Sequence, residues 1–274
     1  MRNINLVETL REEFKTIQMG HASSSDFWGG HRENLHKLIN SGADPNFFFQ
    51  WHPINFTMYC GVTGYASNEI GYLQSLPDWD DRWRPAITEL GEFEMPRYPY
   101  YSDSTATTIH HAYHLSMFEE KIKTHINEMD FIFEFGGGYG DTCRIIHRLG
   151  FKGNYIICDL PELLAIQRFF LEASGIQVST GKVELVNDIA KILAHIPSVD
   201  KKCVISTWAI EESIPKIIDN FISIMPQFNH FLFAMGGDAC FPEIKNTLNN
   251  VGWHKWEIPF LKGHQYMMGK QYAY

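Results

Sequence analysis

The sequence has few basic residues and no cluster of them. Its 274 residues include 23 Lys and Arg against 32 Asp and Glu, which gives a formal net charge of -9. Nucleic-acid binding depends largely on neutralising phosphates with Lys and Arg. An acidic chain without a Lys/Arg-rich run therefore predicts no nucleic-acid partner and argues against RNA and DNA as substrates.

Cysteines and long apolar runs are also scarce. The five cysteines are odd in number and contain no C-x-x-C pair, which favours neither a disulfide framework nor a zinc–thiolate site. No apolar stretch approaches the roughly 18 residues of a membrane span, and acids follow Met1 too soon for a secretory signal. We therefore expect a cytoplasmic protein without a membrane partner. A hydrophobic content of 45% is enough for one or two domains with a sizeable core.

A ladder of glycines is the most informative feature that is present. Residues 131–141 read Phe-Ile-Phe-Glu-Phe-Gly-Gly-Gly-Tyr-Gly-Asp. The apolar run predicts a buried parallel strand, and a helical pattern extends from the last glycine to Gly150. Gly136, Gly138 and Gly140 would let the chain turn sharply and a ligand approach the backbone.

The register of this ladder argues against two common nucleotide sites. In a dinucleotide-binding G-x-G-x-x-G the third glycine would fall on Asp141 or Cys143, and no Lys follows as in a phosphate-binding loop. The acid-x-G-x-G-x-G pattern resembles that of class I S-adenosylmethionine (SAM)-dependent methyltransferases. The resemblance implies that Glu134 stabilises the cationic amino acid end of SAM and that the glycines let the backbone approach SAM closely. A tight turn without a ligand is the alternative.

Further strands are predicted in alternation with helices. Residues 155–158 end at Asp159, an acid placed to bind ribose hydroxyls, or alternatively to cap the helix that follows Leu160 and Pro161. Residues 183–186 precede Asn187 and Asp188, positions that contact adenine in the family. Leu160 and Thr207, each at the end of a predicted strand, are further candidate cofactor contacts. Strands 202–207 and 231–235 precede two extended runs, 253–260 and 265–272, that suit an antiparallel hairpin. We predict an α/β, Rossmann-like class I methyltransferase sheet within a SAM-binding domain, residues 126–274.

Residues 1–125 differ, because they are aromatic-rich and show no alternating strands. Helical spacing at 7–17 and 27–39 predicts a mainly helical lid or substrate region. Residues 104–126 hold His110, His111 and His114. On a helix, His111 shares a stripe with apolar residues, whereas His110 and His114 share the next stripe. One of these imidazoles is a candidate general base; the alternative is that they are structural or face solvent. No metal site is expected, because no nearby Cys or carboxylate completes a ligand set.

A narrower resemblance is carried by three motifs. Glu-Phe-Gly-Gly-Gly-Tyr-Gly, Cys-Asp-Leu-Pro-Glu-Leu and Ser-Thr-Trp-Ala-Ile-Glu-Glu at 206–212 are similar to motifs of sugar O-methyltransferases, as are the surroundings of Trp28 and His114. The resemblance implies SAM-dependent methylation of a hydroxyl on a small, sugar-like acceptor. Candidate acceptor-binding residues are Trp208, Glu211, Glu212 and His264, the last also a weaker base candidate. Family members often have Ser where Glu211 stands, so the role of this position is open.

Several alternatives stay open at the level of sequence. The acceptor could be a small molecule other than a sugar, or the chain could bind SAM or a nucleotide without turnover. Catechol-type enzymes that need a metal have an acid directly after the fourth strand, where this chain has Thr207, Trp208 and Ala209. Metal dependence is therefore not expected. A homo-oligomer is compatible with the sequence.

Overall fold

The structure is a computed structural model that describes residues 4–18, 25–58, 64–89, 93–178, 182–237, 241–259 and 261–272. Within these ranges no helix is both long and apolar enough to cross a membrane. Cys143, Cys158 and Cys203 are buried and form no disulfide. Cys60 and Cys240 lie outside the described residues.

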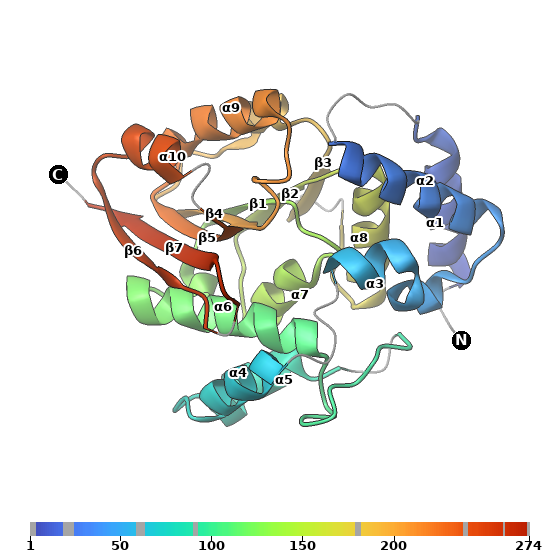
Figure 1. The fold of residues 1–274 in the computed structure, drawn as a ribbon, viewed down its shortest axis with the longest axis horizontal. Helices are drawn as coiled ribbons and strands as arrows, with labels where there is room; N and C mark the ends of the chain where they lie inside the picture. The colour runs from blue at the N-terminus through green and yellow to red at the C-terminus, as the bar shows by residue number, and fades with distance from the viewer. Residues whose placement is uncertain are drawn as a thin grey trace.

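The centre of the molecule is a seven-stranded sheet with the order β3-β2-β1-β4-β5-β7-β6 (Figure 1). Its strands are β1 (Phe131–Phe135), β2 (Asn154–Cys158), β3 (Val183–Val186), β4 (Lys202–Thr207), β5 (His230–Gly236), β6 (Val251–Glu257) and β7 (His264–Gln271). The first five are parallel, whereas β7 pairs antiparallel with both β5 and β6. The predicted α/β sheet with a C-terminal antiparallel hairpin is thereby confirmed.

The order of the strands reverses between β1 and β4. From β1 the chain runs outward through β2 to β3, then returns to place β4 on the other side of β1. In open parallel sheets, ligands bind beyond the carboxyl ends of the strands at such a point. All five residues of β1 are buried, as its continuous apolar run predicts.

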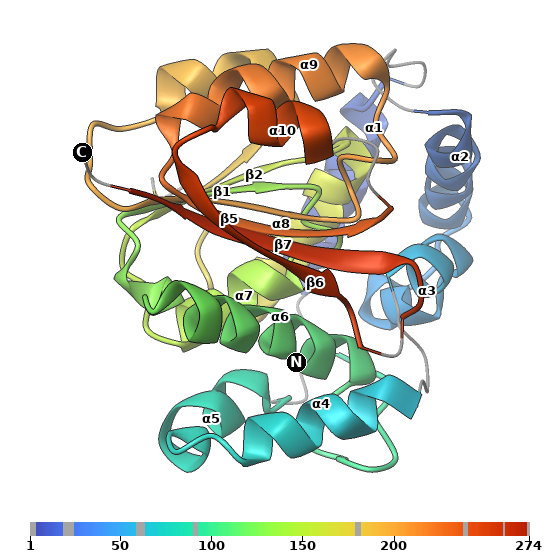
Figure 2. The ribbon, with the colours of Figure 1, turned by 60° about the vertical axis from the view of Figure 1, so that its left-hand side comes forward.

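Helices cover both faces of the sheet (Figure 2). One face carries α9 (Pro215–Ile224) and α10 (Phe241–Thr247), and the other carries α6 (Ala106–Ile122), α7 (Asp141–Arg148) and α8 (Pro161–Ala173). Short 3-10 segments are η1 (Pro45–Gln50), η3 (Ile126–Glu128), η4 (Ile189–His195) and η5 (Met225–Gln227). Helix α8 begins at Pro161 after an extended Leu160, as the Leu-Pro pair predicts.

The chain before residue 125 is helical in the described ranges. Its helices are α1 (Ile4–Thr16), α2 (Asp26–Asn40), α3 (His52–Met58), α4 (Gly64–Gln74), α5 (Arg84–Ile87) and α6, with a π-helical segment, η2 (Trp79–Trp83). Side chains such as Leu10 and Leu35 share one apolar core with Ile132 and Tyr155 of the sheet. The two parts therefore pack intimately, while their division into separate functional regions at residue 125 stays a prediction.

Helix α6 lies between the sheet and α4, which forms a further layer (Figure 2). It is buried almost all round, so His110 and His114 are only 1% and 2% exposed. The possibility that these two histidines face solvent is thus wrong. The sheet covers one face of α6, and α4 covers another, so the histidines beside the apolar stripe are buried as well.

Candidate functional site

A cavity of about 600 Å³ lies beyond the carboxyl ends of the central strands. Its walls come from the turn after β1, the ends of β2 and β4, helix α6 and the region of α2 and α3. Thirteen of the residues predicted from the sequence line it: His110, His111, Glu134, Gly136, Gly138, Asp159, Leu160, Asn187, Thr207, Trp208, Glu211, Glu212 and His264. The structure thus brings together side chains from most of the length of the chain.

Three predicted residues do not line the cavity. His114 is buried and contacts His110, and Gly140 is the residue before α7, where an added Cβ would lie 3.3 Å from Leu171. The carboxylate of Asp188 accepts a hydrogen bond from the backbone N–H of Ala190 and caps η4. These three positions support the walls, and a direct role for them in ligand binding stays a prediction.

The glycine turn places its backbone at the cavity. Gly136, Gly138 and Gly140 all have a positive φ, a backbone conformation that residues with a side chain rarely adopt. At Gly136, where φ is 75°, an added Cβ would lie 2.0 Å from Cβ of Ala209, in the segment after β4. Only glycine therefore allows the turn after β1 to lie so close to that segment.

We expect Gly136→Ala to lower the free energy of unfolding by about 1–3 kcal/mol more than a control in which only backbone strain arises. Gly42→Ala is the matched control, because φ of Gly42 is 84° but nothing lies within 4 Å of its added Cβ. Urea unfolding of both variants measures the difference. Equal losses would contradict the close contact between Gly136 and Ala209.

Glu134 is a buried acid at the end of β1. Its carboxylate accepts a hydrogen bond from the Tyr155 hydroxyl at 2.8 Å. Burial raises the pKa of Glu134 to about 7, although this hydrogen bond and the nearby His111 act in the opposite direction. Within the described residues it has no Lys or Arg partner. A cationic ligand in the cavity would supply the missing counter-charge.

Asp159 directly follows the last residue of β2, two positions beyond Ile157, the residue that pairs with Glu134. Its carboxylate accepts hydrogen bonds from the Leu160 N–H and from Nε2 of Gln167, each at 2.8 Å. Gln167 also donates to the Gly138 carbonyl at 2.9 Å and so couples the acid to the glycine turn. Burial raises the pKa of Asp159 to about 7 against these bonds. The alternative in which Asp159 merely caps the next helix explains neither bond, because α8 begins at Pro161 and neither donor is a backbone N–H of its first turn.

The three histidines of α6 occupy different environments. Nδ1 of His110 lies 2.7 Å from Oε1 of Glu69, and its Nε2 lies 3.0 Å from Nε2 of His114, so both nitrogens are engaged. Burial, and then the neighbouring His110 and His111, lower the pKa of His114 well below its usual range. His111 lines the cavity, and its Nδ1 lies 3.0 Å from Oδ2 of Asp141. Among the three, His111 is best placed to exchange a proton with a ligand.

Trp208 follows β4 in a conformation that is unusual for a bulky residue. Its φ is 59°, and three contacts hold it there. Its backbone N–H donates to Ala234, its indole N–H donates to Nδ1 of His264, and its ring stacks on His110 with centroids 5.6 Å apart. Because Nδ1 of His264 accepts from Trp208, a neutral His264 carries its proton on Nε2 and is poorly suited to act as a base.

The two acids after β4 face the same cavity. Glu211 accepts from the backbone N–H of Gly236, with both oxygens within 2.8 Å. Glu212 accepts from Nε1 of Trp28 at 2.9 Å, a bond across 184 positions. Burial raises the pKa of both carboxyl groups. These contacts connect the edge of the sheet to α2.

Sequence reasoning did not assign several residues to this site. The cavity is also lined by Trp28 of α2 and by Phe56 and Met58 of α3. Asp141, which does not line the cavity, contacts Nδ1 of His111. The only signal for Trp28 was its place in a motif similar to the sugar O-methyltransferases. Asp141 appeared only as the residue that breaks a dinucleotide-binding register. Both depend on contacts between segments far apart in the chain.

The charge of the cavity is of one sign. Glu134, Asp159, Glu211 and Glu212 line it, whereas no Lys or Arg does among the residues that the structure describes. Outside those ranges the sequence contains no Lys or Arg other than Arg2. The cavity is therefore suited to a neutral or cationic ligand and unfavourable for phosphates.

Similarity to known proteins is found among solved structures. No family model and no protein of curated function matches the sequence. A SAM-dependent O-methyltransferase of Thermotoga maritima is 14% identical, with 67% of this chain and 69% of that chain covered and a TM-score of 0.41. A precorrin-6y C5,15-methyltransferase of Geobacter metallireducens is 13% identical, with coverages of 69% and 99% and a TM-score of 0.44.

The M. capricolum protein TrmK, in a structure with S-adenosylhomocysteine, is 12% identical to this chain. The match covers 58% of this chain and 69% of that chain, with a TM-score of 0.42. At these values the similarity carries no argument about substrate or reaction. Ligand and chemistry must be inferred from the residues of this chain.

Proposed function

We propose that this protein is a SAM-dependent O-methyltransferase that acts on a hydroxyl of a small, sugar-like acceptor. The observation that carries the proposal is the pair of buried acids Glu134 and Asp159. Each ends one of two adjacent parallel strands, each has its pKa raised to about 7, and both face one cavity beside a glycine turn. Such acids are expected where a ligand supplies positive charge and hydroxyl groups.

The residues present suit SAM better than a phosphate-bearing cofactor. Glu134 would receive the ammonium group of SAM, Asp159 the ribose hydroxyls and Asn187 the adenine. The carboxylate-lined cavity without Lys or Arg would repel the phosphates of NAD or ATP. When bound, SAM would supply a methyl group attached to a positively charged sulfur. The acceptor oxygen would bond to the methyl carbon while the carbon–sulfur bond breaks and the electron pair of that bond stays on sulfur.

Other side chains that line the cavity are suited to a sugar-like acceptor. Trp28, Phe56 and Trp208 offer aromatic surface, and Glu211 and Glu212 offer hydrogen-bond acceptors for hydroxyl groups. The negative charge favours neutral or amine-bearing acceptors over phosphorylated ones. Residues 1–125 would then act as the substrate region, because Trp28 and Phe56 belong to it.

Proton removal completes the proposed reaction. An imidazole on α6 takes the proton from the acceptor hydroxyl, which is worth roughly 10²- to 10⁴-fold in rate. Alignment of the hydroxyl with the methyl group accounts for most of the remaining acceleration. No metal and no nucleic-acid partner is required.

Calorimetry with SAM, S-adenosylhomocysteine, NAD and ATP tests the cofactor. We expect binding of the first two only, and about tenfold weaker binding of SAM by Glu134→Gln, which keeps the shape but removes the charge. Glu128→Gln is the matched control, because Glu128 pairs with Lys201 on the surface. Binding of NAD or ATP alone, or full SAM affinity in Glu134→Gln, contradicts the assignment.

Methyl transfer from labelled SAM to neutral, amine-bearing and phosphorylated sugars separates the remaining alternatives. Labelled neutral or amine-bearing sugars support the proposal. Transfer only to non-sugar hydroxyl compounds would mean that the acceptor is a small molecule other than a sugar. Tight SAM binding with no transfer to any hydroxyl compound favours a protein that holds SAM without turnover.

A further inference from the structure

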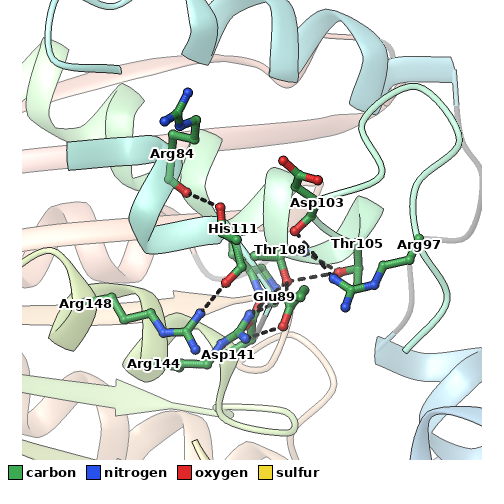
Figure 3. Close-up of polar contacts among 11 residues, drawn as sticks. Arg84, Glu89, Arg97, Asp103, Thr105, Thr108, His111, Asp141, Arg144 and Arg148 are labelled. Carbon is green, nitrogen blue, oxygen red and sulfur yellow. Dashed lines mark hydrogen bonds and ion pairs between the residues drawn. The ribbon is translucent and has the colours of Figure 1, made fainter. Parts of the chain in front are cut away.

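His111 belongs to a buried chain of charged groups contributed by three parts of the fold (Figure 3). Oδ1 of Asp141 accepts from Nε of Arg144 at 2.9 Å, while its Oδ2 faces Nδ1 of His111. Arg144 also donates two hydrogen bonds of 2.6 and 2.7 Å to the carboxylate of Glu89. Thr108 donates to the same carboxylate at 3.1 Å.

Only one member of this chain reaches the cavity. The side chain of His111 is 19% exposed and lines it, whereas those of Asp141, Arg144 and Glu89 are at most 1% exposed and do not. A cluster that served stability alone would not need an imidazole at its cavity end. The arrangement connects a buried set of fixed charges to one group that a ligand can touch.

The network determines which nitrogen of the neutral His111 ring carries the proton. Burial alone would raise the pKa of Asp141, but attraction to Arg144 and the contact with His111 outweigh it and hold the pKa well below its usual range. An ionised Asp141 can only accept a hydrogen bond, so Nδ1 of His111 carries the proton. In the neutral ring, Nε2 is then the unprotonated nitrogen that can accept a proton.

The geometry points to His111 as the catalytic base and to Asp141 as its positioning residue, with Arg144 and Glu89 fixing Asp141. This inference rests on the proposed methyl transfer but assigns the base among three histidines. His110 has both nitrogens engaged, and His114 does not line the cavity. Asp141 acts through His111 by setting its tautomer and holding its ring in place.

The tautomer can be measured without an acceptor. In ¹⁵N-histidine spectra of the full chain, assigned by loss of the signal in His111→Gln, we expect a protonated Nδ1 and an unprotonated Nε2. In Asp141→Asn the proton is expected on Nε2 in most molecules. A wild-type His111 protonated on Nε2, or a tautomer unchanged in Asp141→Asn, overturns the inference. The wild-type measurement decides even if the variant does not fold.

Activity gives a second, independent readout. With labelled SAM and a mixture of neutral methyl glycosides as the probe, Asp141→Asn is expected to lower kcat by about 10³-fold while SAM affinity changes less than about threefold. In a His111→Gln background, Asp141→Asn should have no further effect. An additional loss in the double variant overturns the positioning role. Failure of the wild-type protein to bind SAM would instead remove the proposed function and leave the tautomer result intact.

Discussion

Replacement of Arg144 by alanine is expected to lower the free energy of unfolding by about 3–5 kcal/mol. Arg144 is 1% exposed and lies between Asp141 and Glu89. Removing it leaves the buried carboxylate of Glu89 without a counter-charge and that of Asp141 with only the His111 ring beside it, so each must either stay charged at a high cost or take up a proton. Its guanidinium also lies 5.2 Å from the ring centroid of Phe170, so packing is lost as well.

Urea unfolding at neutral pH measures this loss, and Arg168→Ala is the matched control. Arg168 pairs with Glu13 at 2.7 Å, but the two side chains are 28% and 32% exposed. Solvent screens such a pair, so its loss should cost no more than about 1 kcal/mol. If Arg144→Ala is too unstable to purify, Glu89→Gln offers a milder test, because it leaves the Arg144–Asp141 pair in place. A loss in Arg144→Ala no greater than in the control would mean that the network does not stabilise the fold.

The central sheet could be predicted from sequence because its signals are local. A run of apolar residues ending in an acid marks β1 and β2, and the strand predicted at 183–186 has the bounds observed for β3. The glycine spacing after β1 reflects a close contact that permits no side chain at Gly136. Each of the strand signals lies within a short stretch of chain.

The functions of individual residues at the site depend on contacts that the sequence does not display. Helical spacing correctly put His110 and His114 side by side, since i and i+4 are neighbours on a helix. It could not show that α4 buries them, or that Asp141 on α7 meets His111 on α6. Trp28 on α2 and Glu212 after β4 are joined by a hydrogen bond across 184 positions of the chain. Such tertiary contacts determine which of several similar side chains reaches the ligand.

The affinity for SAM is expected to fall as pH is lowered through about 7. Burial raises the pKa of both Glu134 and Asp159 to about 7 in the ligand-free protein, so each is largely protonated below that pH. A cationic ligand that also donates hydrogen bonds requires the ionised forms, and these protons must leave when it binds. From about pH 8 to about pH 6, the dissociation constant should rise about tenfold if one group must ionise and about a hundredfold if both must. Above about pH 8 it should level off.

The stability of the ligand-free protein should change with pH in the opposite sense to its affinity for SAM. The folded state holds protons on these acids that the unfolded chain, with ordinary pKa values of 4.5 and 3.8, has already released. Their contribution to stability therefore decreases as pH rises from about 4 to about 7. For the affinity, calorimetric titration with SAM from about pH 6 to about pH 8 isolates the contribution of each acid, with Glu134→Gln and Asp159→Asn as controls that retain the titration of SAM itself. Affinity that is as steep in both variants as in the wild type would mean that neither acid contacts the cofactor.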